Sequence, residues 1–145
     1  MRDVLILNGP NLDRLGTREP EIYGSLSLSE IGDSCVEFAK AHSLRIDFRQ
    51  TNDEAELIRW LHEAADRSLP VIMNPAAFTH YSVAVRDAAS MLTAPLIEVH
   101  LSNPLAREEF RHTSLVSGIA HGTISGFGAN SYILALEASV SVNAM

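Results

Sequence analysis

Residues 4–10 read Val-Leu-Ile-Leu-Asn-Gly-Pro, an apolar run that stops at turn-forming residues. Such a run, without polar alternation, is typical of a short strand that is buried on both faces. Residues 70–75, Pro-Val-Ile-Met-Asn-Pro, repeat the pattern later in the chain. Two strands of this kind predict a parallel sheet with helices on each side.

The segments around these two strands alternate between strand and helix patterns. The pairs Ser27/Glu30 and Thr51/Glu54 each match a capping box and predict the starts of two helices. We expect helices over residues 27–42, 51–65, 82–92 and 129–142. We expect the remaining strands at residues 44–48, 94–101 and 119–125, the first of them at a sheet edge because only one of its faces is apolar.

This alternation predicts an α/β protein with a flavodoxin-like three-layer fold, in which a five-stranded parallel sheet of order 2-1-3-4-5 has helices on both faces. The 145 residues suit a single domain, 1–145. Ligands of open parallel sheets bind beyond the carboxyl ends of the strands. Polar residues gather after each apolar run, at 8–23, 49–52, 74–80 and 100–111. The sequence therefore predicts a functional site at that end of the sheet.

The charge balance argues against polyanionic partners. Eleven Lys and Arg against eighteen Asp and Glu give a net charge of -7, which repels nucleic acid and anionic membrane surfaces. No stretch is apolar enough to span a membrane, and the first residues lack the features of a signal peptide. The lone cysteine, Cys35, has no partner for an internal disulfide, which fits a reducing compartment. We expect a cytoplasmic protein.

Several functional motifs of α/β proteins are missing. No GxGxxG or GxxxxGK[ST] loop follows a strand, which argues against a nucleotide. The histidines form no HxxxH pair, so a metal site has little support. Lys40 is the only lysine, and we expect it to project away from the apolar stripe of its helix, which argues against imine chemistry. A flavin or nucleotide protein and a noncatalytic interaction module remain the alternatives.

Arg18 and Tyr23 share one loop that is punctuated by proline and glycine. A phenol ionises near pH 10, so a tyrosine can act as a general base only if its phenolate is stabilised. A guanidinium within a few ångströms provides that stabilisation. The alternative is an exposed tyrosine that packs on an arginine.

Glu98 and His100 lie two apart in a predicted strand, so their side chains face the same side. The carboxylate can then bind one imidazole nitrogen and direct the other towards a ligand, which is how a histidine becomes an oriented general acid. A purely structural Glu–His pair is the alternative.

Further polar groups follow the third and fourth strands. Asn74 and His80 flank a strand-to-helix junction that favours an anionic ligand, although His80 could simply cap the helix. Arg107 and Arg111 are spaced to share a helical face, or to pair in solvent with the neighbouring glutamates. A base, an oriented acid, amides and arginines together favour proton abstraction beside a carbonyl in a small anionic substrate.

Several long motifs follow one another along nearly the whole chain. They are Leu7-Asn-Gly-Pro-Asn-Leu12, Gly16-Thr-Arg-Glu-Pro-Glu-Ile-Tyr-Gly24, Phe48-Arg-Gln-Thr-Asn52, Asn74-Pro-Ala-Ala-Phe-Thr-His80, Ser82-Val-Ala-Val-Arg-Asp87, Ile97-Glu-Val-His-Leu-Ser-Asn103, Ala106-Arg-Glu-Glu-Phe-Arg-His112, Gly126-Phe-Gly128 and Tyr132. In these motifs the sequence resembles the type II 3-dehydroquinate dehydratase family. The resemblance implies reversible trans elimination of water from 3-dehydroquinate to give 3-dehydroshikimate, a step of the shikimate pathway, without cofactor or metal.

The resemblance also implies a role for each site residue. Tyr23 would remove the proton beside the ketone, and Arg18 would hold it as phenolate. Asn11 would help to position a water on the enolate oxygen. His100, oriented by Glu98, would protonate the leaving hydroxyl.

The substrate would be held by residues at the ends of the third and fourth strands. The resemblance places its carboxylate on Asn74 and on the backbone of Leu101 and Ser102, and ring hydroxyls on His80 and Arg111.

A further contact, Asp87, would come from a neighbouring subunit. The resemblance therefore implies at least a trimer, and for the family generally a homododecamer built as four trimers.

A few residues depart from the usual family pattern. Ala76 stands where glycine is frequent, Tyr81 where a small polar residue is common, and Pro104-Leu105 where Val or Ile followed by His is typical. Asp13 replaces a frequent asparagine. None of these changes removes a proposed catalytic group.

Overall fold

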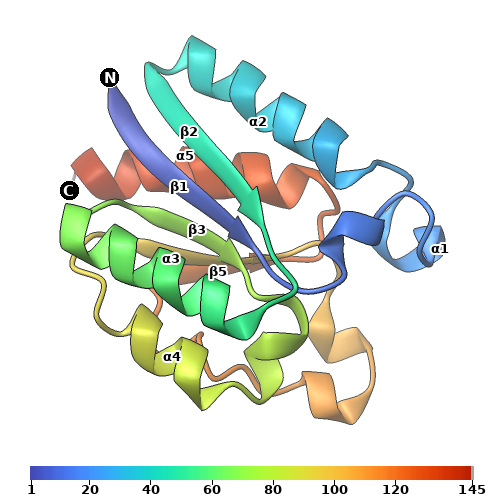
Figure 1. The fold of residues 1–145 in the computed structure, drawn as a ribbon. Helices are drawn as coiled ribbons and strands as arrows, with labels where there is room; N and C mark the ends of the chain where they lie inside the picture. Colours follow the sequence, from blue (N-terminus) through green and yellow to red (C-terminus); the bar gives the residue numbers. More distant parts are fainter. Residues whose placement is uncertain (145) are drawn as a thin grey trace.

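The computed structural model describes residues 1–144, which form a parallel sheet between two layers of helices (Figure 1). The strands are β1 (Arg2–Asn8), β2 (Leu44–Gln50), β3 (Val71–Asn74), β4 (Leu96–His100) and β5 (Gly122–Ser125). They lie in the order β2-β1-β3-β4-β5, and all neighbours are parallel. The predicted fold class and strand order are confirmed.

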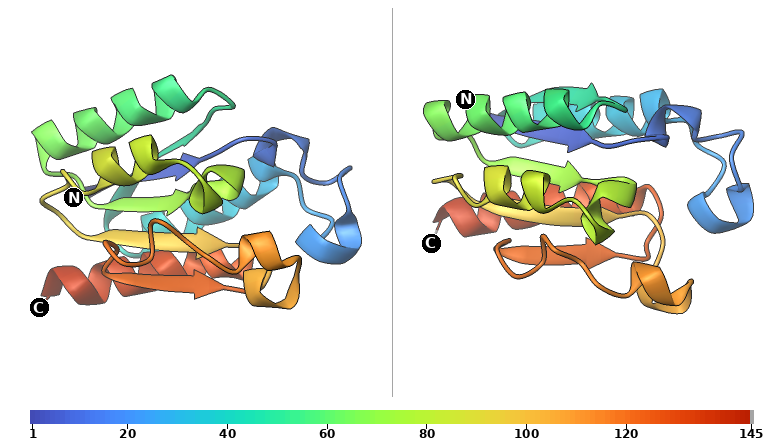
Figure 2. Two further views of the ribbon diagram at one scale, coloured as in Figure 1. Left: turned by 90° about the horizontal axis from the view of Figure 1, so that it is seen from below. Right: turned by 60° about the horizontal axis from the view of Figure 1, so that its bottom comes forward.

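Each face of the sheet is covered by two helices. Helices α2 (Leu28–Ala41) and α5 (Asn130–Ala144) pack on one face, and α3 (Glu54–Arg67) and α4 (Val83–Ala89) pack on the other (Figures 1 and 2). The short helix α1 (Pro20–Tyr23) projects beyond the carboxyl end of β1. The loops that follow β1 and β4 therefore meet at one end of the molecule.

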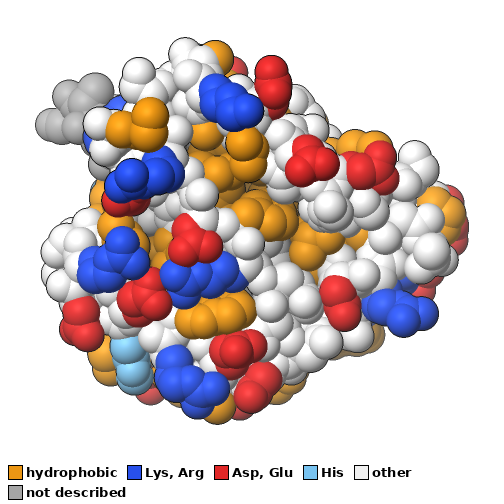
Figure 3. Space-filling view, turned by 45° about the horizontal axis from the view of Figure 1, so that its top comes forward, with side chains coloured by type: hydrophobic (Ala, Val, Ile, Leu, Met, Phe, Trp, Pro, Cys, Tyr) orange, Lys and Arg blue, Asp and Glu red, His pale blue; other side chains and the backbone are white. Residues whose placement is uncertain are grey.

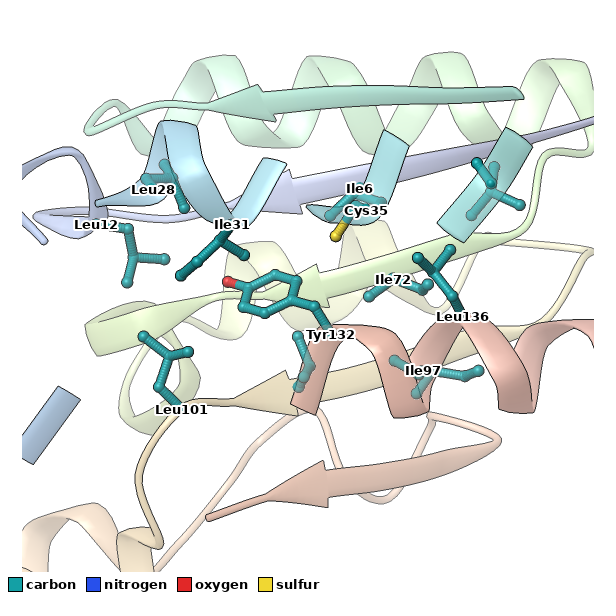
Figure 4. Packing of buried hydrophobic residues seen from close by; sticks show 14 of the residues in the cluster. Ile6, Leu12, Leu28, Ile31, Cys35, Ile72, Ile97, Leu101, Tyr132 and Leu136 are labelled. Atoms are coloured by element: carbon teal, nitrogen blue, oxygen red, sulfur yellow. The ribbon is translucent and has the colours of Figure 1, made fainter. Parts of the chain in front are cut away.

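Strand β1 supplies both apolar layers. Its residues 4–7 are at most 1% exposed, as expected for a strand buried on both faces. Because successive side chains of a strand point in opposite directions, Val4 and Ile6 join the layer under α2 and α5, whereas Leu5 and Leu7 join the layer under α3 and α4. Figure 4 shows Tyr132 of α5 in the first of these layers, between α2 and the sheet.

One of the two predicted capping boxes is present. Ser27 Oγ accepts a hydrogen bond from the Glu30 amide, and Glu30 Oε1 accepts one from the Ser27 amide, as predicted. The Thr51/Glu54 box is wrong, because Asp53 caps α3 by accepting the Ala55 amide at 2.9 Å. Thr51 Oγ1 is already occupied by the Asp53 amide.

Two other expectations need correction. Helix α4 ends at Ala89, three residues before the expected end at Leu92. Arg107 and Arg111 do not share a helix, because two separate 3-10 turns, η3 (Pro104–Ala106) and η4 (Glu109–Arg111), replace it. Asn103 starts the first turn by accepting the Leu105 amide.

The surface carries both signs of charge. On the face in Figure 3, basic side chains are interspersed with acidic ones and form no broad basic patch. Across residues 1–144, no helix has the length and apolar character that a bilayer crossing requires.

Candidate active site

A cavity of about 160 Å³ lies at the carboxyl ends of β1, β3 and β4. It is at the end of the sheet that the sequence predicts. The predicted site residues that line it are Asn11, Arg18, Tyr23, Asn74, His80, His100, Leu101, Ser102 and Arg111. Segments up to about 100 residues apart in the chain are thus brought together by the parallel sheet.

Arg18 and Tyr23 meet at one wall of this cavity. The Arg18 Nη2 atom donates to the Tyr23 hydroxyl at 3.1 Å, and its guanidinium carbon lies 4.4 Å from the centre of the phenol ring. The short helix α1 makes this possible, because it begins at Pro20 and ends at Tyr23, and the next residue, Gly24, turns the chain back with a φ of 88°. A cation therefore contacts the oxygen that would carry the charge of a phenolate.

Arg107 brings a second cation to the same ring. Its guanidinium carbon lies 5.0 Å from the Tyr23 ring centre, and its Nη1 donates to Ser102 Oγ at 3.3 Å. The buried Nε atom has no hydrogen-bond partner within the described residues 1–144. The sequence indicated Arg107 as one of two nearby arginines, but its contact with Tyr23 could not be inferred because the segment is not helical.

Glu98 and His100 form the predicted pair. His100 Nε2 lies 2.6 Å from Glu98 Oε2, and the Glu98 side chain is only 2% exposed. Burial by itself would raise the pKa of Glu98, but hydrogen bonds from His100, Ser117 and Ser114 outweigh it and hold the pKa below its usual value. Glu98 lies behind His100 and does not line the cavity, so Nδ1 is the ring nitrogen left for a ligand.

The Asn74 side chain is fixed by a buried network that the sequence analysis missed. Its Oδ1 accepts the Ala76 amide at 3.1 Å, and its Nδ2 donates to Tyr132 Oη at 3.0 Å. Tyr132 in turn donates to Asn8 Oδ1 at 2.6 Å, and its burial raises its pKa. One N–H of Asn74 remains free for a ligand. The network joins β1, β3 and α5, so only the folded topology reveals it.

Other predicted residues are held by single contacts. His80 Nδ1 lies 2.9 Å from the Thr113 carbonyl oxygen, which leaves Nε2 to the cavity. The Asn11 amide donates to Asn52 Oδ1 at 2.8 Å. Arg111 Nε pairs with Glu108, so the predicted alternative of a glutamate pairing is also present while Arg111 lines the cavity.

Asp87 is separate from this cavity. It lies on α4, pairs with Arg86 at 3.4 Å, and has a side chain that is 61% exposed. Within this one chain, the structure does not bring Asp87 to the other predicted residues.

The residues that depart from the family pattern lie around the cavity and do not block it. Ala76 and Pro104 line it, and Ala76 has a φ of 52°, in the region that favours glycine. Tyr81 and Leu105 are 62% and 68% exposed, and Asp13 is also exposed.

The fold and the cavity define a flavodoxin-like α/β protein whose site combines a Tyr–Arg pair and a His–Glu pair, side chains that suit acid–base chemistry. Comparisons with known proteins refine this class. The model of the family described as dehydroquinase class II matches residues 2–140. The chain belongs to this family.

Individual relatives carry names that agree with this family assignment. The chain is 54% identical to "3-dehydroquinate dehydratase 2" of Pseudomonas aeruginosa over 94% of this chain and 92% of that protein. It is 55% identical to the "3-dehydroquinate dehydratase" of Salinispora tropica over 92% and 94% of the two chains. Its fold matches the crystal structure of the type II dehydroquinase from Propionibacterium acnes with a TM-score of 0.95 and 47% identity, covering 97% of each chain.

Proposed function

We propose that this chain is a hydro-lyase that converts 3-dehydroquinate reversibly to 3-dehydroshikimate in the shikimate pathway, and so serves the synthesis of chorismate and aromatic amino acids. The reaction is a trans elimination: a proton leaves the carbon beside the ketone, an enolate forms, and the hydroxyl leaves as water. The observation that carries the proposal is that a Tyr–Arg pair and a His–Glu pair line or directly back one cavity.

Tyr23 takes the proton from the carbon beside the ketone. Its phenolate oxygen is the base, and Arg18 at 3.1 Å and Arg107 over the ring stabilise the negative charge. The enolate oxygen that forms next is stabilised by a water that Asn11 helps to position. This part of the cavity supplies the first half of the elimination.

His100 acts as the acid in the second half. Its Nε2–H is held by Glu98, so the imidazolium gives a proton from Nδ1 to the leaving hydroxyl, which departs as water. The negative Glu98 stabilises the imidazolium before transfer. A proton must then pass from Tyr23 to His100 through solvent to reset the site.

The substrate carboxylate binds at the free N–H of Asn74 and at the backbone of Leu101 and Ser102. His80 and Arg111 bind ring hydroxyls, since both line the cavity and keep donors that are not used by Thr113 and Glu108.

Asp87 completes the site from a neighbouring subunit. This part of the proposal is supported by its exposure and by its position outside the cavity of its own chain. The assembly would be a homododecamer of four trimers, each chain contributing residues 1–145 as one catalytic domain. We also propose a location in the cytoplasm and a reaction that needs neither cofactor nor metal.

The test is the absorbance of the product. Dehydration creates a conjugated enone, so adding 3-dehydroquinate to purified, metal-stripped protein should produce a rise in ultraviolet absorbance. The His100→Ala variant should fold and show no comparable rise. Absence of any rise with folded, oligomeric wild type would reject the proposed reaction.

A further inference from the structure

The carboxylate of Glu98 receives more hydrogen bonds than the pairing with His100 requires. Ser117 Oγ lies 2.7 Å from Oε1, and Ser114 Oγ lies 3.1 Å from Oε1 and 2.9 Å from Oε2. Both serines come from the segment between η4 and β5, which the catalytic proposal leaves without a role.

The direction of these bonds can be assigned from the partners of Ser114. Its hydroxyl oxygen accepts the backbone amides of Val116 and Ser117, each at 3.1 Å. Because an amide can only donate, both lone pairs of the oxygen are engaged, and its single proton is left to point at Glu98. Glu98 must therefore accept a hydrogen bond from Ser114, as an ionised carboxylate oxygen does and the protonated oxygen of a carboxylic acid does not.

The serine segment is anchored independently of Glu98. The Val116 side chain is fully buried in the layer under α3 and α4, and the Leu115 amide donates to the Thr79 carbonyl oxygen at 2.9 Å. The two hydroxyls are therefore held in place before any substrate binds, which is the condition for orienting another side chain.

We propose that Ser114 and Ser117 are positioning residues that keep Glu98 ionised and fix its rotation, so that His100 carries its proton on Nε2 and presents Nδ1 to the substrate. This inference rests on the proposed dehydratase function and extends it to residues that do not touch the substrate. The serines act through Glu98, and Glu98 acts through His100.

The charged surroundings of Glu98 are compatible with this role. His100 faces it from its own strand, while the uncharged Thr79 and Thr123 lie on neighbouring elements. Next to the cavity of about 160 Å³ lies a second cavity, which His80, Arg111 and His112 line together with Glu98 and His100. No other carboxylate lines this cavity in the described part of the chain, so Glu98 is its acidic group.

The decisive variant is Ser117→Ala, because Ser117 Oγ bonds only to Glu98 among the described residues, whereas Ser114→Ala also removes two backbone contacts. We expect Ser117→Ala to lower kcat by about tenfold and to leave KM within about twofold. Loss of a donor raises the pKa of Glu98, so the acid limb of the kcat profile should move to higher pH. Ser117→Thr, which keeps a hydroxyl, should restore both.

The matched control is Ser34→Ala, which removes a hydroxyl bonded only to its own helix, at the Glu30 carbonyl oxygen. It should leave kcat and its pH profile unchanged. An unchanged kcat and acid limb in Ser117→Ala, with an active wild type, would overturn the role of the serines.

A second measurement does not depend on turnover. The proton on His100 Nε2 should give a strongly downfield NMR signal in the wild type, and Ser117→Ala should shift or broaden it while Ser34→Ala should not. If the wild type lacks dehydratase activity, the proposed function fails, but this signal still decides whether the serines hold Glu98. An unshifted signal would refute the inference.

Discussion

The hydroxyl of Tyr23 is the single atom on which the proposed proton abstraction depends. Tyr23→Phe removes it but keeps the ring that Arg18 and Arg107 contact. We expect turnover to fall by a factor of about 10² to 10⁴, the usual contribution of a general base. Enone absorbance measures the loss, and thermal unfolding should show an intact fold. Tyr81→Phe, at an exposed tyrosine, serves as the control and should retain activity.

Ala76 adopts a backbone conformation that suits glycine better, with a φ of 52°. Ala76→Gly should therefore raise the free energy of unfolding by about 1 kcal/mol, because relief of the strain exceeds the added flexibility of the unfolded chain. Ala77→Gly, one residue later in the same turn and without positive φ, should lower it. Urea unfolding of both variants checks the sign. Stabilisation by both, or by neither, would contradict the account of strain at Ala76.

Individual site residues differ in how far the sequence predicts them. The Arg18–Tyr23 and Glu98–His100 pairs follow from short spacings and are present as predicted. The contact of Arg107 with Tyr23 depends on two loops that meet only in the folded chain. The role predicted for Asp87 is not visible in a single chain, because Asp87 is exposed and does not line the cavity of its own chain.

At the scale of elements, the pattern of apolar residues predicts all five strands but not every element end: β5 begins at Gly122 and not at residue 119, and α4 ends at Ala89 and not at Leu92. Thr51, Asp53 and Glu54 all carry groups that can cap α3, and the sequence cannot tell which of them is free to do so. In the structure, Thr51 already accepts the Asp53 amide and Glu54 accepts the Ser82 hydroxyl, which leaves Asp53 as the cap. Helix ends are decided by such competition among short-range hydrogen bonds.

The corrected cap can be tested directly. Asp53→Ala should lower the free energy of unfolding by about 1 kcal/mol, because the amide of Ala55 loses its partner. Ser27→Ala, at the confirmed cap of α2, should cost a similar amount, whereas Ser34→Ala should cost much less. Urea unfolding provides the comparison. An Asp53→Ala variant as stable as wild type would mean that another group caps α3.

For the whole molecule, Glu98 links stability to pH. Its pKa is lowered in the folded state, so its contribution is present above the usual glutamate pKa of about 4.3 and is lost as the pH falls through the lowered value. We expect Glu98→Gln to reduce stability by about 2 kcal/mol at neutral pH and to differ less from wild type in acid. Denaturant unfolding of both proteins at several pH values measures this difference. The other carboxylates are present in both proteins, so their contributions cancel. A stability difference between wild type and Glu98→Gln that stays constant with pH would contradict this link between Glu98 and pH.

The proposed sharing of sites between subunits predicts complementation. Asp87→Ala and His100→Ala chains should each be inactive alone. In mixed oligomers, an Asp87→Ala chain with an intact cavity can receive Asp87 from a His100→Ala neighbour, so mixing after dissociation should restore part of the activity. Enone absorbance and light scattering follow activity and size. Mixed oligomers without any activity would show that Asp87 acts within its own chain or not at all.

Cys35 carries the only sulfhydryl of the chain, and it lies on the fully buried face of α2. Burial raises its pKa to about 12, so it holds almost no thiolate at neutral pH and should resist alkylating reagents. The chain therefore has no reactive thiol that would compete with a cysteine introduced for site-specific labelling. A cysteine introduced at the exposed Glu21 of α1 would be the one reactive position, and a fluorophore attached there would report movements of the loop that carries Arg18.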